Sequence, residues 1–160
     1  MASPTYDLLD STTLASSASS VTFSSISQDY RDLVLVCNPV LSPGYNPVVR
    51  FNGDTGANYP LVKMRGNGSA AQSEAVTSDT YLDIAAYVSG TSLIVTQIMD
   101  YSATDKHKTV LNRGNNAALS VQALAARWAN TSAISSILIY EVNATNFGVG
   151  SSFHLYGIAS

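Results

Sequence analysis

Charged residues are scarce in this sequence of 160 residues. Lys, Arg, Asp and Glu make up 12% of the chain, whereas apolar residues reach 46%; soluble domains usually carry about 25% charged residues. Ser, Thr, Asn and Gly must therefore cover much of the surface. Uncharged surface is easier to desolvate than Lys or Glu, and the cores of protein interfaces are depleted in charge. The composition therefore favours a protein that associates with other protein surfaces.

Basic residues are also too few for a nucleic-acid partner. The chain carries 8 Lys and Arg against 11 Asp and Glu, a net charge of −3, and no stretch concentrates the positive charge that a phosphate backbone attracts. No run of 18 apolar residues is present, so we expect no membrane partner. The first ten residues, MASPTYDLLD, lack a basic segment followed by an apolar run. We therefore expect no signal peptide and synthesis in a cytoplasm.

Cysteine and histidine supply no site for a metal or cofactor. Cys37 is the only cysteine, which excludes an internal disulfide, and it follows the apolar run Leu33 to Val36, where a free thiol packs as a small hydrophobe. His107 and His154 have no Cys or acid at the spacing of zinc ligands. We expect no cofactor, no bound metal and no catalytic cysteine.

The remaining polar residues do not form a catalytic motif. There is no GxSxG sequence around any of the many serines, and the scattered aspartates favour turns over a glycosidase pair. Asn52, Asp54 and Asn58 weakly resemble a calcium loop, but only one acid is present, and Asx turns explain the same residues. The sequence therefore names no catalytic residue and predicts that the protein is not an enzyme.

Aromatic residues leave two interpretations open. A flat aromatic surface could stack against sugar rings, whereas Tyr and Trp are equally typical of cores and protein interfaces. The candidates are Tyr45, Tyr59, Tyr81, Tyr87, Tyr101 and Trp128.

The C-terminal stretch gives the clearest structural signal. Residues alternate with a period of two through Ile137 to Glu141 and again through Phe153 to Ile158, which is typical of extended chain. Asn143 to Gly150 lies between them and is rich in residues that tolerate positive φ. We predict two strands joined as an antiparallel hairpin, in the middle of a sheet or at a subunit contact.

Other short segments read as strands separated by turn residues. These are Tyr6 to Leu9, Val21 to Ile26, Arg31 to Val36, Val48 to Asn52, Leu61 to Met64, Tyr81 to Val88, Leu93 to Tyr101, Lys108 to Asn112 and Ala117 to Ala126. Tyr81 to Val88 fits a helical turn as well, and Ala117 to Ala126 has helical composition without helix caps. The chain is therefore predicted to be all-β, an antiparallel β-sandwich.

Apart from Tyr6 to Leu9, the first twenty residues and two later segments are predicted to lie outside the strands. Residues 1–20 form a flexible N-terminal arm or an edge segment, and residues 21–160 form a single β-sandwich domain. Asn38 to Pro47 contains three prolines and is predicted to be a surface loop. Arg65 to Ala75 has no periodicity and is predicted to be a long exposed loop.

Four phrases together resemble a group of virion structural proteins of tailed bacteriophages. They are ISQDYRDLVLV (Ile26 to Val36), VRFNGDTGANY (Val49 to Tyr59), ARWANTSAISSILIY (Ala126 to Tyr140) and NFGVGSSFHLYGI (Asn146 to Ile158). The resemblance implies a β-sandwich of jelly-roll type without catalysis. It implies a capsid decoration, or cement, protein that forms a homotrimer in the virion and bridges and stabilises capsid subunits. Its partners are then copies of itself and the major capsid protein or other virion proteins. The alternative is a tail or tail-fibre component that binds host surface polysaccharide.

The same resemblance assigns structural roles to particular residues. A structural corner is implied at Phe51, Asn52, Gly53, Asp54, Gly56, Asn58 and Tyr59. A closing strand is implied at Gly150, Phe153, Leu155, Tyr156, Gly157 and Ile158. The two predicted loops resemble the variable parts of the group, which places possible partner contacts at Tyr45, Asn46, Arg65 and Asn67.

Overall fold

Thirteen β-strands make up the regular structure in the computed structural model, which describes residues 5–85, 88–116 and 120–159. In chain order they are β1 Tyr6–Thr13, β2 Ser20–Phe23, β3 Asp32–Asn38, β4 Val40–Tyr45, β5 Pro47–Phe51, β6 Leu61–Gly66, β7 Ala71–Val76, β8 Leu82–Asp83, β9 Val88–Met99, β10 Lys108–Asn116, β11 Val121–Trp128, β12 Ile137–Glu141 and β13 Ser152–Ile158. Within those ranges the chain has no helix that could cross a membrane.

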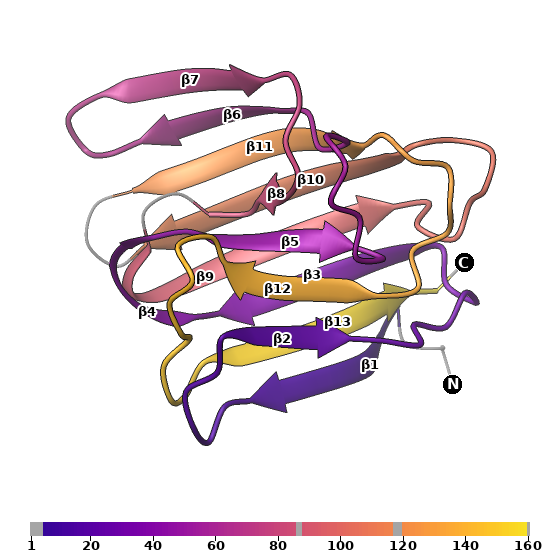
Figure 1. Cartoon of the computed structure of the whole chain (residues 1–160), viewed down its shortest axis with the longest axis horizontal. Coiled ribbons are helices and arrows are strands. Elements are labelled where there is room, and N and C mark those ends of the chain that lie inside the picture. Colours follow the sequence, from indigo (N-terminus) through magenta and orange to yellow (C-terminus); the bar gives the residue numbers. More distant parts are fainter. Residues whose placement is uncertain (1–4, 86–87, 117–119, 160) are drawn as a thin grey trace.

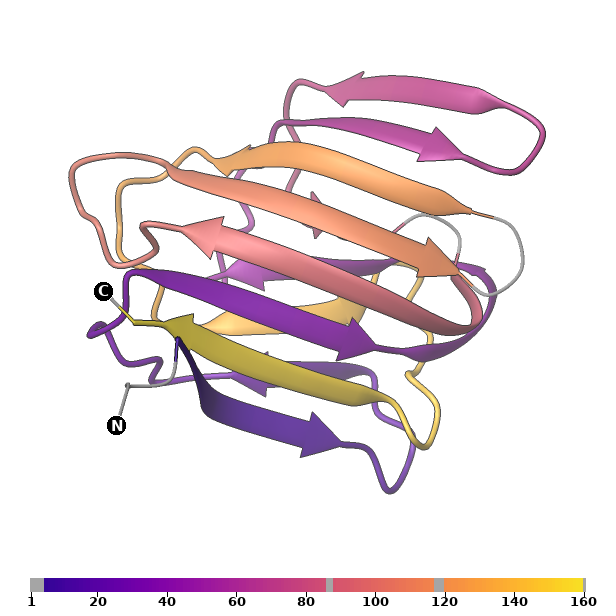
Figure 2. The same ribbon diagram turned by 180° about the vertical axis from the view of Figure 1, so that it is seen from behind.

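The strands form two sheets that pack face to face (Figures 1 and 2). The larger sheet has the order β1-β13-β3-β9-β10-β11-β6-β7, with β4 also pairing with β9, and the smaller has the order β2-β12-β5-β8. Neighbouring strands are antiparallel throughout. The predicted all-β antiparallel sandwich is confirmed.

The core lies between the sheets and follows the alternation of side chains along each strand. In β13, Phe153 and Leu155 are buried, and in β12, Ile137 and Ile139 face them from the smaller sheet. Removing one such side chain from water contributes about 2 kcal/mol. The core is therefore built from residues that alternate with a period of two, as expected for strands buried on one face.

The predicted C-terminal hairpin is wrong, because β12 and β13 belong to different sheets. β12 pairs with β2 and β5, whereas β13 pairs with β1 and β3. The segment between them carries Phe147 into the core, where its ring lies 5.1 Å from that of Phe153. The chain thus crosses from the smaller sheet to the larger one through a segment that Phe147 anchors in the core. Both strands are central in their own sheets.

The flexible N-terminal arm is also wrong for the part that the structure describes. From Tyr6 to Thr13 the chain is an edge strand paired with β13, so the other alternative, an edge segment, applies. A bulge interrupts the register between Leu8 and Asp10. The strand predicted from Tyr6 to Leu9 is therefore confirmed as the first half of β1, and the polar residues that follow had obscured its continuation to Thr13.

Both predicted loops contain strands. Asn38 to Pro47 includes β4, whose pairing with β9 shifts register between Leu41 and Tyr45. Pro43 lies in that interval, as expected because proline cannot donate to a ladder. Arg65 to Ala75 includes most of β7, which pairs residue by residue with β6. Neither side of β7 is fully buried, so its sequence has no apolar alternation to reveal it.

Both ambiguous segments contain strand and no helix where they are described. β11 alternates strictly between exposed and buried side chains from Val121 to Trp128, which confirms the strand interpretation for Val121 to Ala126. β8 is a strand of two residues, Leu82–Asp83. Residues 86–87 and 117–119 of the two predicted segments lie outside the described ranges.

Gly157 provides a test of the packing beneath the closing strand. A Cβ atom there would lie 2.4 Å from Cγ of Tyr30, so the tyrosine ring would have to move. We expect Gly157→Ala to lower the free energy of unfolding by about 1–3 kcal/mol, measured by urea denaturation. At Gly66, a Cβ would meet only Val121 Cγ1 at 3.9 Å, so Gly66→Ala is the matched control. Equal losses in both variants would contradict this packing.

Candidate functional site

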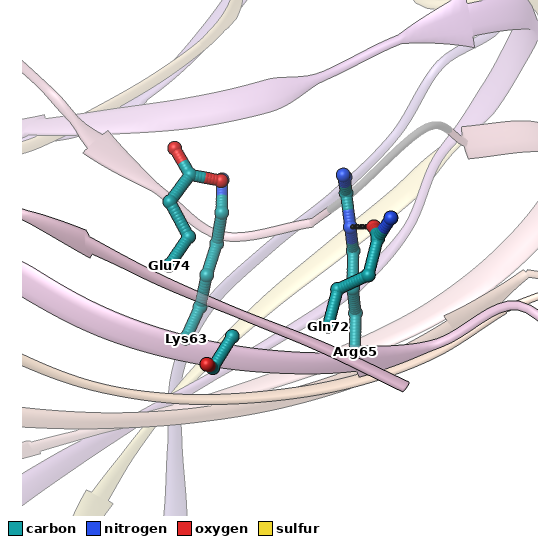
Figure 3. A pocket seen from close by; sticks show the side chains of 5 residues that line it. Lys63, Arg65, Gln72 and Glu74 are labelled. Atoms are coloured by element: carbon teal, nitrogen blue, oxygen red, sulfur yellow. Dashed lines mark hydrogen bonds and ion pairs between the residues drawn. The ribbon is translucent and has the colours of Figure 1, made fainter. Parts of the chain in front are cut away.

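The β6–β7 hairpin carries a polar pocket on its inner side. β6 supplies Lys63 and Arg65, and β7 supplies Glu74 and Gln72 directly opposite them. Figure 3 shows these side chains projecting together from the two strands, and the pocket that they line has a volume of about 320 Å³. Lys63 Nζ lies 3.2 Å from Glu74 Oε2, and Arg65 Nε donates to Gln72 Oε1 at 2.7 Å. The hairpin thus cross-links its own strands through side chains.

Lys63 also connects the two sheets. Its Nζ donates to Asp83 Oδ2 at 3.0 Å, and Asp83 lies on β8 in the smaller sheet. The two side chains are only 11% and 13% exposed, so this is a buried salt bridge. Burial alone would lower the pKa of Lys63, but Asp83 and Glu74 together raise it above its ordinary value. Lys63 is therefore held as a cation between two carboxylates.

This arrangement positions side chains and presents no obvious reacting group. The lysine is engaged by two acids, and the arginine is held by a glutamine. Within the described ranges, no group of three His, Cys, Asp or Glu side chains could hold a metal ion.

The outer face is the side of the larger sheet that turns away from the smaller sheet, and it is largely apolar. Among the described residues, eight large apolar side chains are exposed, and seven of them lie on this face. The seven are Tyr6, Leu8, Val62, Met64, Leu93, Leu111 and Val121; the eighth is Val149. Such a concentration on one side of a molecule marks an interaction surface.

Charge is nearly absent from the half of the outer face built by β9, β10, β11, β6 and β7. Glu74 is the only acid in these five strands, and it lies on the inner side with Lys63. Arg113 and Arg127 are exposed on this half. A shallow depression of about 540 Å³ runs across it, lined in part by Met64 and Val121. The surface is suited to an apolar partner that carries a few acids.

Comparison with known proteins does not assign this chain to a family. No family model, curated protein or solved structure matches this chain.

The seven residues of the predicted structural corner run from Phe51, the last residue of β5, to Tyr59, just before β6. Asn52 and Gly53 turn the chain with φ of 52° and 66°. Asn52 Nδ2 donates to Ala133 O at 2.7 Å, and its Oδ1 accepts from the backbone N–H of Ser135 at 2.9 Å. These bonds attach the corner to the segment before β12.

Asp54 is the centre of this corner. Its Oδ1 accepts from the Gly56 N–H at 2.8 Å, and its Oδ2 accepts from Asn58 Nδ2 at 2.9 Å and Trp128 Nε1 at 2.7 Å. Tyr59 Oη donates to the Asp54 carbonyl and accepts from the backbone N–H of Phe51, both at 3.1 Å. The carboxylate is therefore held by hydrogen-bond donors, two of which, from Gly56 and Asn58, belong to its own turn.

The residues of the predicted closing strand alternate between the core and the outer face. Phe153, Leu155 and Gly157 face the core, whereas Tyr156 and Ile158 are half-buried on the outer face. Gly150 precedes the strand in a turn with φ of 85°. This strand thus contributes to both surfaces of the larger sheet.

The four predicted partner contacts do not form one site. Arg65 and Asn67 belong to the β6–β7 hairpin, where Asn67 Oδ1 accepts from the backbone N–H groups of Ser69 and Ala70. The backbone N–H of Asn46 donates to Glu141 Oε1 at 3.0 Å, next to β12. The side chain of Tyr45 lies outside the described part of the chain.

The aromatic platform is not formed by the candidates whose side chains are described. Tyr59, Tyr101 and Trp128 are buried in the core, and Tyr81 is half-buried. The side chain of Tyr45 and residue Tyr87 are not described.

The Lys63–Asp83 pair was not predicted from the sequence. The one signal for it was the position of a charged residue, Lys63, between the apolar residues Val62 and Met64.

The buried pair can be tested by removing its cation. Lys63→Met leaves the Asp83 carboxylate buried without its partner, so we expect the free energy of unfolding to fall by about 3 kcal/mol. Glu74→Gln removes the half-exposed partner of the same lysine and should cost less than about 1 kcal/mol. Urea denaturation of both variants measures the difference, and similar losses would show that Asp83 is not the principal partner.

The Asp54 corner predicts a particular dependence of stability on pH. Burial would raise the pKa of Asp54, but hydrogen bonds from Asn58, Gly56 and Trp128 lower it below its ordinary value. The carboxylate therefore stabilises the fold above the unfolded-state pKa of about 4, and this contribution is lost as the pH falls through the lower folded-state pKa.

Asp54→Asn should lower the free energy of unfolding by about 2 kcal/mol at neutral pH, because buried donors lose a charged acceptor. The difference from the unaltered protein should shrink as the pH approaches 2. Asp105→Asn, in an exposed turn, is the control and should change little. Urea denaturation across this pH range measures both, and a difference independent of pH would contradict the role of the charge.

Proposed function

We propose that this protein is a structural component of a tailed-bacteriophage particle, a capsid decoration protein that bridges and stabilises shell subunits. The observation that carries the proposal is the outer face, which gathers seven of the eight large exposed apolar side chains of the described residues on one side. Burying one of them against a neighbour contributes up to about 2 kcal/mol. The phrases that resemble phage virion proteins supply the biological setting.

The charge content of the outer face indicates what kind of surface it would bind. It contains two arginines and no acid on the strands β6, β7, β9, β10 and β11, so little charge must be desolvated on binding. A shell protein with a neutral, partly acidic surface fits it, and the major capsid protein is the principal candidate. Attachment through several weak patches acts as one strong attachment, because all contacts must break together.

The strand order supports the expected jelly-roll arrangement. A jelly roll has eight strands in two sheets. The set β1-β13-β3-β9 lies in the larger sheet and the set β2-β12-β5-β8 forms the smaller one, with successive parts of the chain passing between them. The remaining hairpins, β6–β7 and β10–β11, extend the larger sheet at one side (Figure 1). These additions build much of the neutral half of the outer face.

The tail alternative has less support. A polysaccharide-binding tail component needs an exposed aromatic surface, and three of the candidate aromatics are in the core. The homotrimer and the absence of enzymatic activity stay predictions.

Particle labelling tests the proposal directly. Antibody against the purified protein should label the shell, and not the tail, of the phage particles that contain it. Particles made without the protein should lose their DNA at a lower temperature, and purified protein should bind back and restore their stability. Labelling confined to the tail would support the alternative and contradict a decoration role.

A matched pair of variants tests the surface. Val121 on the outer face is 63% exposed, and Val149 away from it is 62% exposed, so lysine at either position should leave the fold intact. We expect Val121→Lys to weaken rebinding to stripped particles about tenfold, because a desolvated charge costs at least 1–2 kcal/mol. Val149→Lys should bind normally. Equal weakening by both variants would argue against the outer face.

A further inference from the structure

The last strand of the larger sheet, β7, is an open edge without the usual protection. Edge strands are normally guarded against pairing by bulges, prolines or charges. β1, at the other edge, has a bulge after Leu8 and carries Asp7 and Asp10. β7 has no proline, pairs with β6 without a register shift, and bears one charge, Glu74, which points to the inner side and pairs with Lys63 at 3.2 Å. The two edges are therefore different in kind.

The pairing within the hairpin shows which backbone groups β7 presents. The Asn67 N–H donates to the Ala70 carbonyl at 3.1 Å, which makes these residues a hydrogen-bonded pair. Hydrogen-bonded and non-hydrogen-bonded pairs alternate along an antiparallel ladder. Ala71, Ser73 and Ala75 therefore direct their N–H and C=O groups away from β6, toward the open edge.

We propose that a second copy of this chain pairs with this edge, so that two β7 strands run antiparallel about a two-fold axis at Ser73. The inference rests on the proposed function and deepens it, because it names one of the surfaces through which the protein associates. It gives a dimer as the alternative to the homotrimer that the resemblance implies. An edge that pairs with its own copy is self-complementary and closes after two copies.

Side-chain charge selects this register. With Ser73 on the axis, Gln72 of each copy lies directly opposite Glu74 of the other. An axis at Glu74 would place two carboxylates opposite each other, which destabilises a strand pair. The chosen register also places Ala71 opposite Ala75, so only small side chains meet on the outer face.

The inner side is already arranged for this contact (Figure 3). Arg65 can only donate, so its bond to Gln72 at 2.7 Å fixes Oε1 of that amide as the acceptor. The Gln72 NH₂ group is then available to donate to Glu74 of the second copy. Each side of the axis would carry one continuous row, Lys63 and Glu74 from one copy followed by Gln72 and Arg65 from the other.

Cysteine cross-linking tests the axis. Residues in a hydrogen-bonded antiparallel pair have Cα atoms about 5.5 Å apart, within the range that a disulfide spans. Ser73→Cys should therefore form a covalent dimer under mild oxidation, seen on a non-reducing gel. Ala75→Cys is the matched control, because its opposite residue is Ala71 and it should stay uncoupled. The native Cys37 is buried, so the unaltered protein is a clean blank.

A charge exchange tests the register. Gln72→Glu places a carboxylate opposite Glu74 of the second copy, while its own Arg65 can still hold it and preserve the fold. We expect the dimer to dissociate about tenfold more readily, since two symmetric contacts are affected. Adding Glu74→Gln to this variant restores one acid and one amide in each opposing pair and should recover the affinity. Sedimentation equilibrium measures all three proteins.

The outcomes separate this inference from the proposed function. A dimer with twice the 16.9 kDa chain mass supports β7 pairing. The same dimer should be cross-linked by Ser73→Cys and weakened by Gln72→Glu. A monomer, a trimer, or equal cross-linking by Ala75→Cys overturns it. None of these measurements uses phage particles, so a negative result leaves the shell-labelling test intact, and a negative shell-labelling result leaves the dimer intact.

Discussion

The salt bridge between Lys63 and Asp83 closes the side of the sandwich where the sheets differ in width. The larger sheet has nine strands and the smaller has four, so the β6–β7 hairpin extends past the smaller sheet (Figure 1). Apolar residues at both Lys63 and Asp83 could have been buried without charge, because whole buried pairs are often replaceable. The lysine instead reaches β8 and Glu74 at once, which fixes the hairpin relative to both sheets.

This constraint explains the inverted pattern of β6. Lys63 is buried, while its neighbours Val62 and Met64 are exposed on the outer face. An isolated domain gains nothing from that exchange, since apolar area stays in water and a charge is desolvated. The inversion is useful only when a partner covers Val62 and Met64. The buried ion pair then keeps the strand from reversing its faces, because a shift of one residue would carry Lys63 outward and break the contact with Asp83.

The sequence predicted strands wherever apolar alternation was strong, and it failed where pairing is non-local. Leu93 to Tyr101 and Phe153 to Ile158 bury every second side chain, and both are strands over nearly all of their length. β7 has no buried face, so local pattern could not reveal it. The partner of β13 at one side is β1, at the other end of the chain, and no local rule supplies such a pairing.

The candidate site was harder to predict than the fold for the same reason. Arg65 and Asn67 were chosen as loop residues and proved to belong to a hairpin. Lys63 and Asp83 meet only because the two sheets that contain β6 and β8 pack against each other. The Asp54 corner was easier, because Asn58 and Gly56 are its close neighbours in sequence. Its bonds to Trp128, Ala133 and Ser135 depend on the tertiary fold.

An open edge beside an apolar face has a physical consequence for attachment to a repeating shell. Side chains keep their alternation across a strand pair, so joining two β7 edges would place two outer faces on the same side of one continuous sheet. When one face binds the shell, the second is held near the next site, and its binding becomes intramolecular. Each face can then be weak and neutral while the pair stays attached. A single copy with charged, soluble faces would lose this advantage, which gives a reason for the scarcity of charge in these strands.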